Sequence, residues 1–387
     1  MSIAACLHGE NELNIFPSSP EHTRNRFAHR SQRLHLDLPL LLGLLLLSII
    51  GLLVLYSASG QDLQLVVRQA VRLGMAFGVM LVVAQITPHL FFYWTPWLYA
   101  LGILLLLAVL VAGEMSGGAQ RWLQLGVVRF QPSEMLKIIV PMMIAYFFVD
   151  KELPPKVIHV IGAMLLALVP AILVAWEPDL GTALLILCAG GFVIFFAGIG
   201  WRFLLSLGVL ATACAPLLWF LMHDYQRQRV LTFFNPEQDP LGAGYHIIQS
   251  KIAIGSGGLF GKGWLNGTQS QLDFLPERST DFVFAVVSEE FGLLGIIALF
   301  AVYLFVIFRG LYLTLNTQEL FGRLLGGGLV MTFFVYVFVN IGMVSGLLPV
   351  VGVPLPLLSY GGSSLVTLLA AFGILMSMNT HRRLLSD

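Results

Sequence analysis

Ten long apolar segments constrain this chain more than any other feature of its sequence. A membrane-spanning helix needs about 20 mostly apolar residues. The ten candidates are residues 38–57, 70–88, 92–112, 133–149, 157–176, 180–199, 202–222, 282–308, 325–346 and 363–380. Only 11% of the residues are charged, whereas a soluble domain carries about 25%. The sequence therefore predicts an all-α polytopic membrane protein with about ten transmembrane helices.

Basic residues beside the apolar segments predict how the chain crosses the membrane. Four arginines between residues 24 and 33 precede the first segment, and Arg382 and Arg383 follow the last. Short loops rich in Lys and Arg stay in the cytoplasm, so an even number of spans places both termini there. We expect a polar, disordered cytoplasmic N-terminal arm at residues 1–37 and a single membrane domain at residues 38–383.

Most of the polar sequence then falls on the extracytoplasmic side. Residues 223–280, between the seventh and eighth segments, form the largest loop, and loops of this length usually carry function. The basic residues of this loop are Arg227, Arg229, Lys251, Lys262 and Arg278. They belong either to a solvated loop or to a cradle for a diphosphate, whose oxygens suit Arg side chains. Arg121 and Arg129 lie in a short outer loop, where the positive-inside rule disfavours them, and are further candidates.

Asp281 opens the apolar run of the eighth segment, in the stretch LPERSTDFVFAVVSEEFG. A serine or threonine just before it is expected to cap the helix, which would place Asp281 in the first turn. On a helical period Asp281 shares a face with Ala285, Ser288 and Gly292. This small, partly polar face predicts a water-filled cavity with Asp281 at its mouth as a general base. The alternative is that Asp281 only complements the helix dipole.

Two further acids, Glu289 and Glu290, lie within the same segment. A charge at bilayer depth costs about 2.5–3.5 kcal/mol on insertion scales, so such groups are usually paired or functional. The two acids point about 80° and 180° away from the Asp281 face, at about 100° per residue. They cannot both line one cavity. We expect Glu290 to pair with another helix and Glu289 to be structural or to support Asp281.

Two more acidic groups lie near the outer ends of other segments. Glu134 and Lys137 are three residues apart with the acid first, an order that favours an ion pair within one helix. Glu177 and Asp179 flank Pro178 in the turn between the fifth and sixth segments. They are either turn residues or an acidic rim that faces a cation or sugar hydroxyls.

Several classes of function find no support in the sequence. The 21 basic and 21 acidic residues cancel, so no bulk charge attracts nucleic acid. The glycines of GSGGLFGKG fit neither common nucleotide-binding motif. The three cysteines and nine histidines show no metal-ligand spacing. No cofactor is certain, and a divalent cation is the one candidate.

Five motifs, taken together, resemble the shape, elongation, division and sporulation (SEDS) family of bacterial membrane proteins. They are RWLQLGVVRFQPSEMLK, PDLGTALL, GYHIIQSKIAIGSGGLFGKG, LPERSTDFVFAVVSEEFG and NIGMVSGLLPVVGVPLPLLSYGGSS. The resemblance covers residues 38–383, and the long outer loop is most similar to the elongation member. Two positions depart from the family pattern: Glu177, where Gln is usual, and Asn235, where Asp is common.

The resemblance implies a ten-helix peptidoglycan glycosyltransferase of the bacterial inner membrane that uses lipid II and an undecaprenyl-diphosphate-linked glycan. It implies that Asp281 is catalytic, and we expect an inverting reaction. It further implies that Trp122 is tied to activity, that Glu134 and Lys137 form an ion pair, and that the partner is a class B penicillin-binding protein. The substrate-binding candidates are Trp122, Arg121, Arg227, Arg229, Lys251, Lys262 and Ser288, and the supporting candidates are Glu134, Lys137, Asp179 and Glu289.

Two other functions are compatible with a many-span protein that carries acids. One is a flippase that moves lipid II across the bilayer, and the other is a scaffold of the elongation complex without chemistry. A carrier needs a polar path through the bilayer midplane, whereas the fifth to seventh segments offer little beyond Thr182, Ser206 and Thr212. Polar groups crowd the outer face instead, which favours the enzyme.

Overall fold

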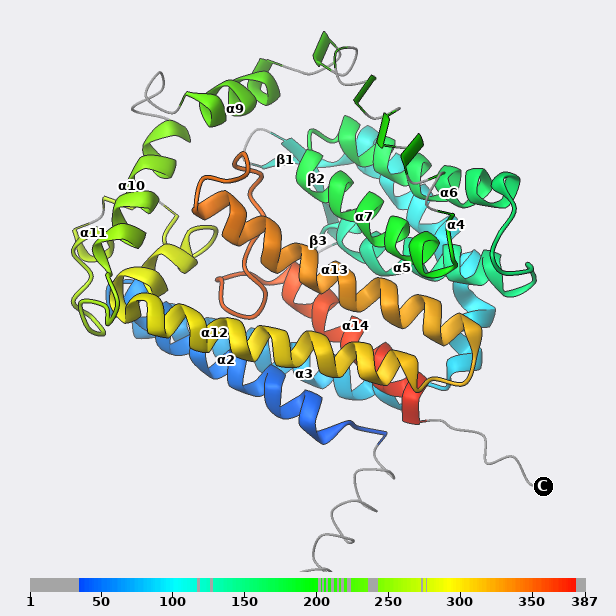
Figure 1. Cartoon of the computed structure of the whole chain (residues 1–387), viewed down its shortest axis with the longest axis horizontal. Helices are drawn as coiled ribbons and strands as arrows, with labels where there is room; N and C mark the ends of the chain where they lie inside the picture. The colour runs from blue at the N-terminus through cyan, green and yellow to red at the C-terminus, as the bar shows by residue number, and fades with distance from the viewer. Residues whose placement is uncertain are drawn as a thin grey trace, which may run out of the picture.

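Nine of the ten predicted segments form helices in the computed structural model (Figure 1). The structure describes residues 35–380 except 117–118, 126–127, 201–202, 204, 207, 210–211, 214–215, 217–218, 221–223, 236–242, 273 and 276. The helices are α2 (Leu38–Ala58), α3 (Leu63–Gln85), α4 (Pro88–Ala112), α5 (Pro132–Val149), α6 (Val157–Trp176), α7 (Leu180–Phe196), α12 (Val283–Leu315), α13 (Leu320–Val344) and α14 (Ser363–Thr380). Within the described residues, eight of them are long and apolar enough to cross a membrane, and α7, with 17 residues, is shorter. The predicted segment 202–222 lies largely outside the described residues, as do residues 1–34 of the predicted arm.

Local sequence explains where several of these helices begin. The side chain of Asp37 accepts a hydrogen bond from the Leu40 N–H, and Pro39 occupies the first turn of α2, where a missing N–H does no harm. Asp62 caps α3 through the N–H groups of Gln64 and Leu65. An aspartate at this position satisfies N–H groups that have no partner within the helix.

The helices pack into one bundle around two large apolar clusters. One cluster joins α2, α3, α12 and α14, and the other joins α4 to α7 with α13 and α14. The helix α14 lies along α3, while α12 lies between α2 and α13 (Figure 1). Gly373 allows the close contact of α14 with α3, because a Cβ atom there would lie 2.6 Å from the Met80 carbonyl oxygen.

A small β-sheet interrupts the helices, so the prediction of an all-α fold is incomplete. Between α4 and α5, strands β1 (Glu114–Ser116), β2 (Ala119–Leu125) and β3 (Val128–Phe130) form an antiparallel sheet in the order β1-β2-β3. The sequence of β2, AQRWLQL, mixes apolar and polar residues without strict alternation, so it lacks the clear period of two by which strands are recognised. The strands are short and lie between two long apolar segments, so the sequence predicted only a loop there.

The large loop between the seventh and eighth segments is partly helical. It contains α9 (Asp224–Phe234), α10 (Ala243–Ser256) and the single turn α11 (Thr268–Gln271). These helices gather at one end of the bundle, whereas the start of α2 and the end of α14 lie at the opposite end (Figure 1). The described chain therefore has a loop-rich end and an end that holds both termini of the bundle.

The longest helix, α12, is broken near its start. Gly292 has φ 62° and ψ −161°, outside the helical region. Residues 257–263, just after α10, lie against this break. The N–H groups of Lys262 and Gly263 donate to the carbonyls of Glu289 and Glu290, both at 3.0 Å. The N–H groups of Leu293 and Leu294 donate back to the carbonyls of residues 258 and 259. Backbone groups freed by the break are thus satisfied by this loop, as membrane depth requires.

Candidate active site

Asp281 lies in a turn before α12, so the prediction that it occupies the first helical turn is wrong. The helix begins at Val283 with Phe282 as its cap residue. The preceding turn closes on Glu277, whose carbonyl oxygen accepts hydrogen bonds from the N–H groups of Thr280 and Phe282. The hydroxyl of Thr280 donates to Glu277 instead of capping the helix. This competing turn moves Asp281 off the helix.

The backbone of Asp281 is held by α13 and by the last outer loop (residues 345–362). The side-chain amide of Asn340, fully buried in α13, donates to the main-chain oxygens of Asp281 and Val353, both at 2.8 Å. The N–H of Tyr360 donates to the Ser279 carbonyl at 2.8 Å. We did not single out Asn340 from the sequence, although an amide within an apolar segment is a signal that could have found it.

The carboxylate of Asp281 is partly exposed and accepts no hydrogen bond from any described residue. Its Oδ2 atom lies beside Gly352, which has φ +74° and where a Cβ atom would be 3.4 Å from that oxygen. Burial and the nearby charge of Glu277 raise the pKa of Asp281, Arg229 lowers it, and the resulting pKa is about 6. The acid is therefore mostly ionised at pH 7 and is a stronger base than an exposed aspartate.

Two of the predicted cations lie next to the last outer loop. The guanidinium of Arg229 in α9 donates to the Val350 carbonyl at 3.2 Å, and its charge acts on Asp281. The side chain of Lys251 in α10 covers Gly346, where an added Cβ atom would lie 2.2 Å from the lysine Cε. Lys251 is exposed and has no hydrogen bond or ion pair with any described residue. We call Asp281, Glu277, Arg229, Lys251 and Asn340 the Asp281 centre.

The structure places the other three predicted loop cations elsewhere. Arg278 donates to the Ser270 carbonyl within the large loop. Arg227 donates to the carbonyls of Trp219 and Phe220, at 2.9 and 2.8 Å. The ammonium of Lys262 contacts Glu289 at 2.8 Å and the Thr268 hydroxyl at 2.6 Å. All three side chains have partners within the protein and hold the loop in place.

Glu289 and Glu290 also stabilise the loop and helix contacts. The buried carboxylate of Glu289 accepts hydrogen bonds from Lys262 and from the N–H groups of Gln269 and Ser270 at the start of α11. It thus supports the loop and makes no contact with Asp281. Glu290 accepts a hydrogen bond from the Ser57 hydroxyl of α2, which confirms the predicted pairing with another helix.

The prediction of a water-filled cavity along the helix face below Asp281 is wrong. Ala285 and Ser288 are fully buried, and the Ser288 hydroxyl donates to the Phe284 carbonyl within the helix at 2.7 Å. A Cβ atom at Gly257 would lie 2.0 Å from the Ser288 carbonyl oxygen, so the loop after α10 covers this face. Small residues at this spacing allow close packing of the backbone here and do not line a cavity.

The predicted ion pair in α5 is confirmed and extends to two other helices. The Lys137 ammonium lies 2.6 Å from the Glu134 carboxylate, and both side chains are buried. Lys137 also contacts the Tyr336 hydroxyl of α13, and the Thr367 hydroxyl of α14 donates to Glu134 at 3.3 Å. The pair therefore ties α5 to α13 and α14.

A second polar group, which we call the outer turn cluster, comprises Arg121, Gln131, Glu177 and Asp179. Asp179 caps α7 through the Thr182 N–H and accepts a hydrogen bond from Gln131. Arg121 lies 3.7 Å from Asp179 and donates to the Pro178 carbonyl at 2.6 Å. Trp122, the next residue of β2, is partly exposed and pairs in register with Glu114. Arg129 lies 3.7 Å from Glu114 across the sheet, so both outer arginines have acidic partners.

Glu177 is the acid of the outer turn cluster whose carboxylate has the fewest interactions. It is 1% exposed, and neither carboxylate oxygen has a hydrogen-bond partner among the described residues. Burial and the nearby charge of Asp179 raise its pKa, Arg121 lowers it, and the resulting pKa is about 8. The side chain is therefore mostly protonated at neutral pH. A neutral carboxylic acid is close in shape and polarity to Gln, the residue that is usual at this position in the SEDS family.

Comparison with known proteins covers nearly the whole chain. The family model of the FtsW, RodA and SpoVE cell cycle proteins matches residues 37–384. The peptidoglycan glycosyltransferase MrdB of Escherichia coli (strain K12) is 57% identical over 355 residues, which cover 92% of this chain and 96% of MrdB. The peptidoglycan glycosyltransferase RodA of Treponema pallidum (strain Nichols) is 34% identical, with 89% of this chain and 98% of that protein covered.

Solved structures agree with these sequence relatives. A chain from a peptidoglycan synthase complex that coordinates polymerization and crosslinking matches with a TM-score of 0.78 and 34% identity, over 89% of this chain and 97% of that chain. The crystal structure of the rod shape determining protein RodA of Thermus thermophilus matches with a TM-score of 0.69 and 31% identity, over 90% and 97% of the two chains. The fold of this chain is therefore that of these membrane proteins.

Proposed function

The chain belongs to the family of FtsW, RodA and SpoVE cell cycle proteins and is a peptidoglycan glycosyltransferase of the elongation type, and we propose that it polymerises lipid II with Asp281 as the general base. The environment of the Asp281 carboxylate is the observation that supports its role as the base. It has a raised pKa of about 6, a fixed backbone and no hydrogen-bond donor among the described residues. By contrast, Glu134, Asp179 and Glu289 all accept hydrogen bonds. Glu177 also lacks a partner among the described residues, but it is buried and mostly protonated at neutral pH.

The proposed reaction joins two lipid-linked sugars. The donor is the growing glycan, bonded through its anomeric carbon to undecaprenyl diphosphate, and the acceptor is a hydroxyl of lipid II. Asp281 takes the hydroxyl proton as the oxygen attacks the anomeric carbon. The bond to the diphosphate breaks on the opposite face, so the configuration is inverted. A positioned base contributes about 10²–10⁴ in rate.

Positive charge beside the base supports departure of the diphosphate. Arg229 and Lys251 both contact the last outer loop next to Asp281, and cations placed where charge develops stabilise the transition state. Arg229 is the stronger candidate, because its charge acts on Asp281, whereas Lys251 is placed only against Gly346 of the same loop. A requirement for a divalent cation stays a prediction. Polymerisation rates measured with magnesium and with a chelator would test it.

The same proposal assigns place and partner. We assign the chain to the bacterial inner membrane as one membrane domain at residues 38–383, with both termini in the cytoplasm and the Asp281 centre outside. The arginines ahead of α2 and after α14 support this orientation. We further propose a class B penicillin-binding protein as the partner, which the match to a synthase complex supports.

A lipid II flippase and a scaffold are the alternatives that an experiment must separate. The parental protein and Asp281→Asn, each with the transpeptidase, would be given lipid II in proteoliposomes. We expect the variant to lose about 10²–10⁴ in polymerisation rate. It should fold normally, because Asn340 bonds the main-chain oxygen of residue 281 and not its carboxylate.

A matched control is Asp150→Asn, which changes an exposed aspartate at the end of α5 and should keep the parental rate. Parental polymerisation by Asp281→Asn would remove Asp281 from the mechanism. Movement of lipid II across the bilayer without any polymer would favour the flippase.

A further inference from the structure

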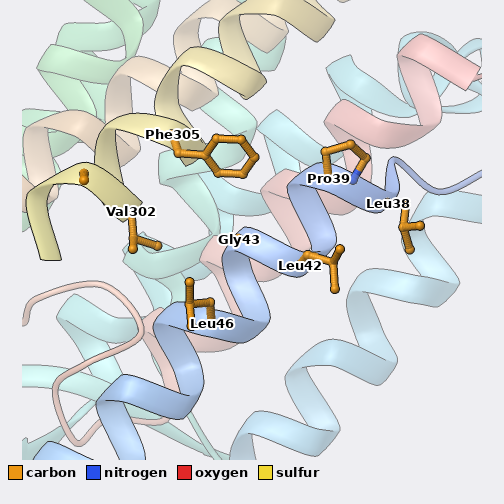
Figure 2. A pocket seen from close by; sticks show the side chains of 8 residues that line it. Leu38, Pro39, Leu42, Gly43, Leu46, Val302 and Phe305 are labelled. Atoms are coloured by element: carbon orange, nitrogen blue, oxygen red, sulfur yellow. The ribbon is translucent and has the colours of Figure 1, made fainter. Parts of the chain in front are cut away.

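An apolar groove lies between α2 and α12, away from the Asp281 centre. Figure 2 shows its walls, formed by α2 side chains on one helix and α12 side chains on the other. The lining residues are Leu38, Pro39, Leu42, Gly43, Leu46, Ala301, Val302 and Phe305, around a cavity of about 490 Å³. Leu42 is 56% exposed and Phe305 is 47% exposed. The groove is therefore open to the membrane along its side.

Gly43 forms the floor of the groove, where the two helices touch. A Cβ atom there would lie 2.9 Å from the Val306 side chain and 3.1 Å from the Phe305 ring. The groove starts at the first residue of α2 and ends at Leu46, about 12 Å further at 1.5 Å per residue. It therefore occupies only the half of the bilayer next to the end that we assign to the cytoplasm.

A charged group stands at the entrance of the groove. Arg309, two turns after Val302 on α12, binds Asp37, the residue just before Leu38, through Nε at 3.0 Å and Nη2 at 2.7 Å. Its Nη1 donates to no described acceptor, and the side chain is 28% exposed. The sequence adds four arginines between residues 24 and 33. Basic clusters immediately beside a membrane span typically bind anionic lipids.

We propose that this groove binds one anionic phospholipid of the cytoplasmic leaflet, with an acyl chain between α2 and α12 and the phosphate on Arg309. The chain would fill apolar surface, and the phosphate would receive charge-assisted hydrogen bonds from a guanidinium. This site goes beyond the proposed glycosyltransferase reaction, whose centre lies at the opposite end of the bundle.

A lipid fits the groove better than a transmembrane helix of a partner. A helix that crosses the hydrocarbon core runs for about 30 Å, whereas the groove is about 12 Å long. The cationic group at its entrance also matches a phosphate, while a transmembrane helix has no need of a negative charge at that position. We therefore assign the groove to a lipid and leave the helix as an outcome of the test.

The experiment measures lipid binding to the purified full chain by native mass spectrometry. Phosphatidylglycerol is titrated against phosphatidylcholine with matched acyl chains. Both lipids carry a phosphate, but only phosphatidylglycerol is anionic, because the choline cation balances the phosphate charge of phosphatidylcholine. We therefore expect phosphatidylglycerol to bind about tenfold more tightly. Ala301→Trp, which fills the groove from an exposed position, should reduce binding of both lipids about tenfold. The control Ile297→Trp lies one turn earlier on α12, is also exposed and does not line the groove.

Two charge variants test the headgroup contact separately from folding. Arg309→Gln should abolish the preference for phosphatidylglycerol, whereas Arg323→Gln, an exposed arginine at the start of α13, should not. Asp37→Asn keeps a good capping residue on α2 and frees Arg309, so the preference should increase. Equal binding of both lipids by the parental protein would overturn the proposal. So would an Ala301→Trp variant that loses its transpeptidase but binds lipid normally, because the groove would then hold the partner's helix.

Discussion

Asp281 differs from Glu289 and Asp179 in what surrounds its oxygens. It differs from Glu177, which likewise has no hydrogen-bond partner among the described residues, in being mostly ionised at neutral pH. Glu289 is bound by a lysine and by two backbone N–H groups, and Asp179 caps a helix. Asp281 has its backbone fixed by Asn340, while its carboxylate accepts no hydrogen bond from the described residues. A fixed backbone with a partly buried carboxylate that accepts no hydrogen bond from the described residues suits the general base that we propose.

The pH dependence of polymerisation should report this carboxylate. A base must be ionised, so kcat/KM should fall as the pH drops through about 6, the pKa of Asp281. The negative charge of Glu277 raises that pKa, so Glu277→Gln should lower it and move the acid limb to lower pH. The glutamine can still accept the hydrogen bond from Thr280. Initial rates between pH 5 and 8 would measure both effects, and an unmoved limb in Glu277→Gln would assign it to another group.

The ion pair of Glu134 and Lys137 offers a second test at the scale of residues. Removing one partner leaves an uncompensated charge in the bundle interior, which costs about 3–5 kcal/mol. Lys137→Met should therefore strongly lower the thermal unfolding temperature in detergent, and Glu134→Gln should do so as well. The double variant should recover much of the loss, because no charge is then left alone. A double variant with the summed loss of both single variants would show that the two side chains act independently.

At the scale of elements, α12 is two helical pieces joined at Gly292. Residues 257–263 satisfy the backbone groups that the break exposes, and Gly261 comes so close that a Cβ on Gly292 would lie 2.3 Å from its N atom. The same loop carries Lys262, which binds Glu289. The loop thus fixes the start of α12, and with it the turn that presents Asp281.

Gly292→Ala should therefore destabilise the protein. The residue has φ +62°, a conformation that costs a residue with a side chain about 1–3 kcal/mol, and the added methyl group would clash with the backbone of Gly261. Thermal unfolding in detergent would measure the loss. Gly78→Ala in α3, where nothing lies within 4 Å of the added carbon, should be neutral or slightly stabilising. Equal behaviour of the two variants would contradict the role of Gly292 as a conformational requirement.

At the scale of the whole molecule, the last outer loop connects most elements of the outer end. It contacts α2 where a Cβ on Gly51 would lie 2.3 Å from the Leu357 carbonyl oxygen, and α7 where Gly181 meets Val351. Gln69 of α3 donates to the Ser359 carbonyl. Through Asn340 and Arg229 the loop also reaches α13 and α9. The Asp281 centre and the outer turn cluster therefore share one rigid support.

The proposed orientation makes a prediction about accessibility from the two sides of the membrane. In a variant whose three cysteines are replaced by serine, Asn266→Cys would lie exposed in the large loop and Gln318→Cys in the turn between α12 and α13. A membrane-impermeant maleimide should label residue 266 in intact spheroplasts and residue 318 only after permeabilisation. The reverse pattern would invert the orientation and place Asp281 in the cytoplasm.

The sequence alone determined the parts of this protein that depend on local composition. Apolar length predicted nine of the observed helices to within a few residues at most ends, because a segment that crosses lipid must satisfy its own backbone hydrogen bonds and be mostly apolar. The spacing of Glu134 and Lys137 predicted their ion pair, since both lie on one helix. The motifs around Asp281 and Trp122 pointed to the family that the comparisons then showed.

Tertiary structure decided what depends on residues far apart in the chain. Helical period placed Ser288 on a wet face, but the loop after α10 covers that face. The basic residues of the large loop looked equivalent in sequence, yet Arg227 and Lys262 have partners elsewhere in the protein. The charge of Arg229 acts on Asp281, and Lys251 lies against Gly346 of the last outer loop. Asn340, 59 positions from Asp281, fixes its backbone. Such contacts arise from the packing of whole helices and loops, and no pattern along the chain encodes which side chain a long loop will meet.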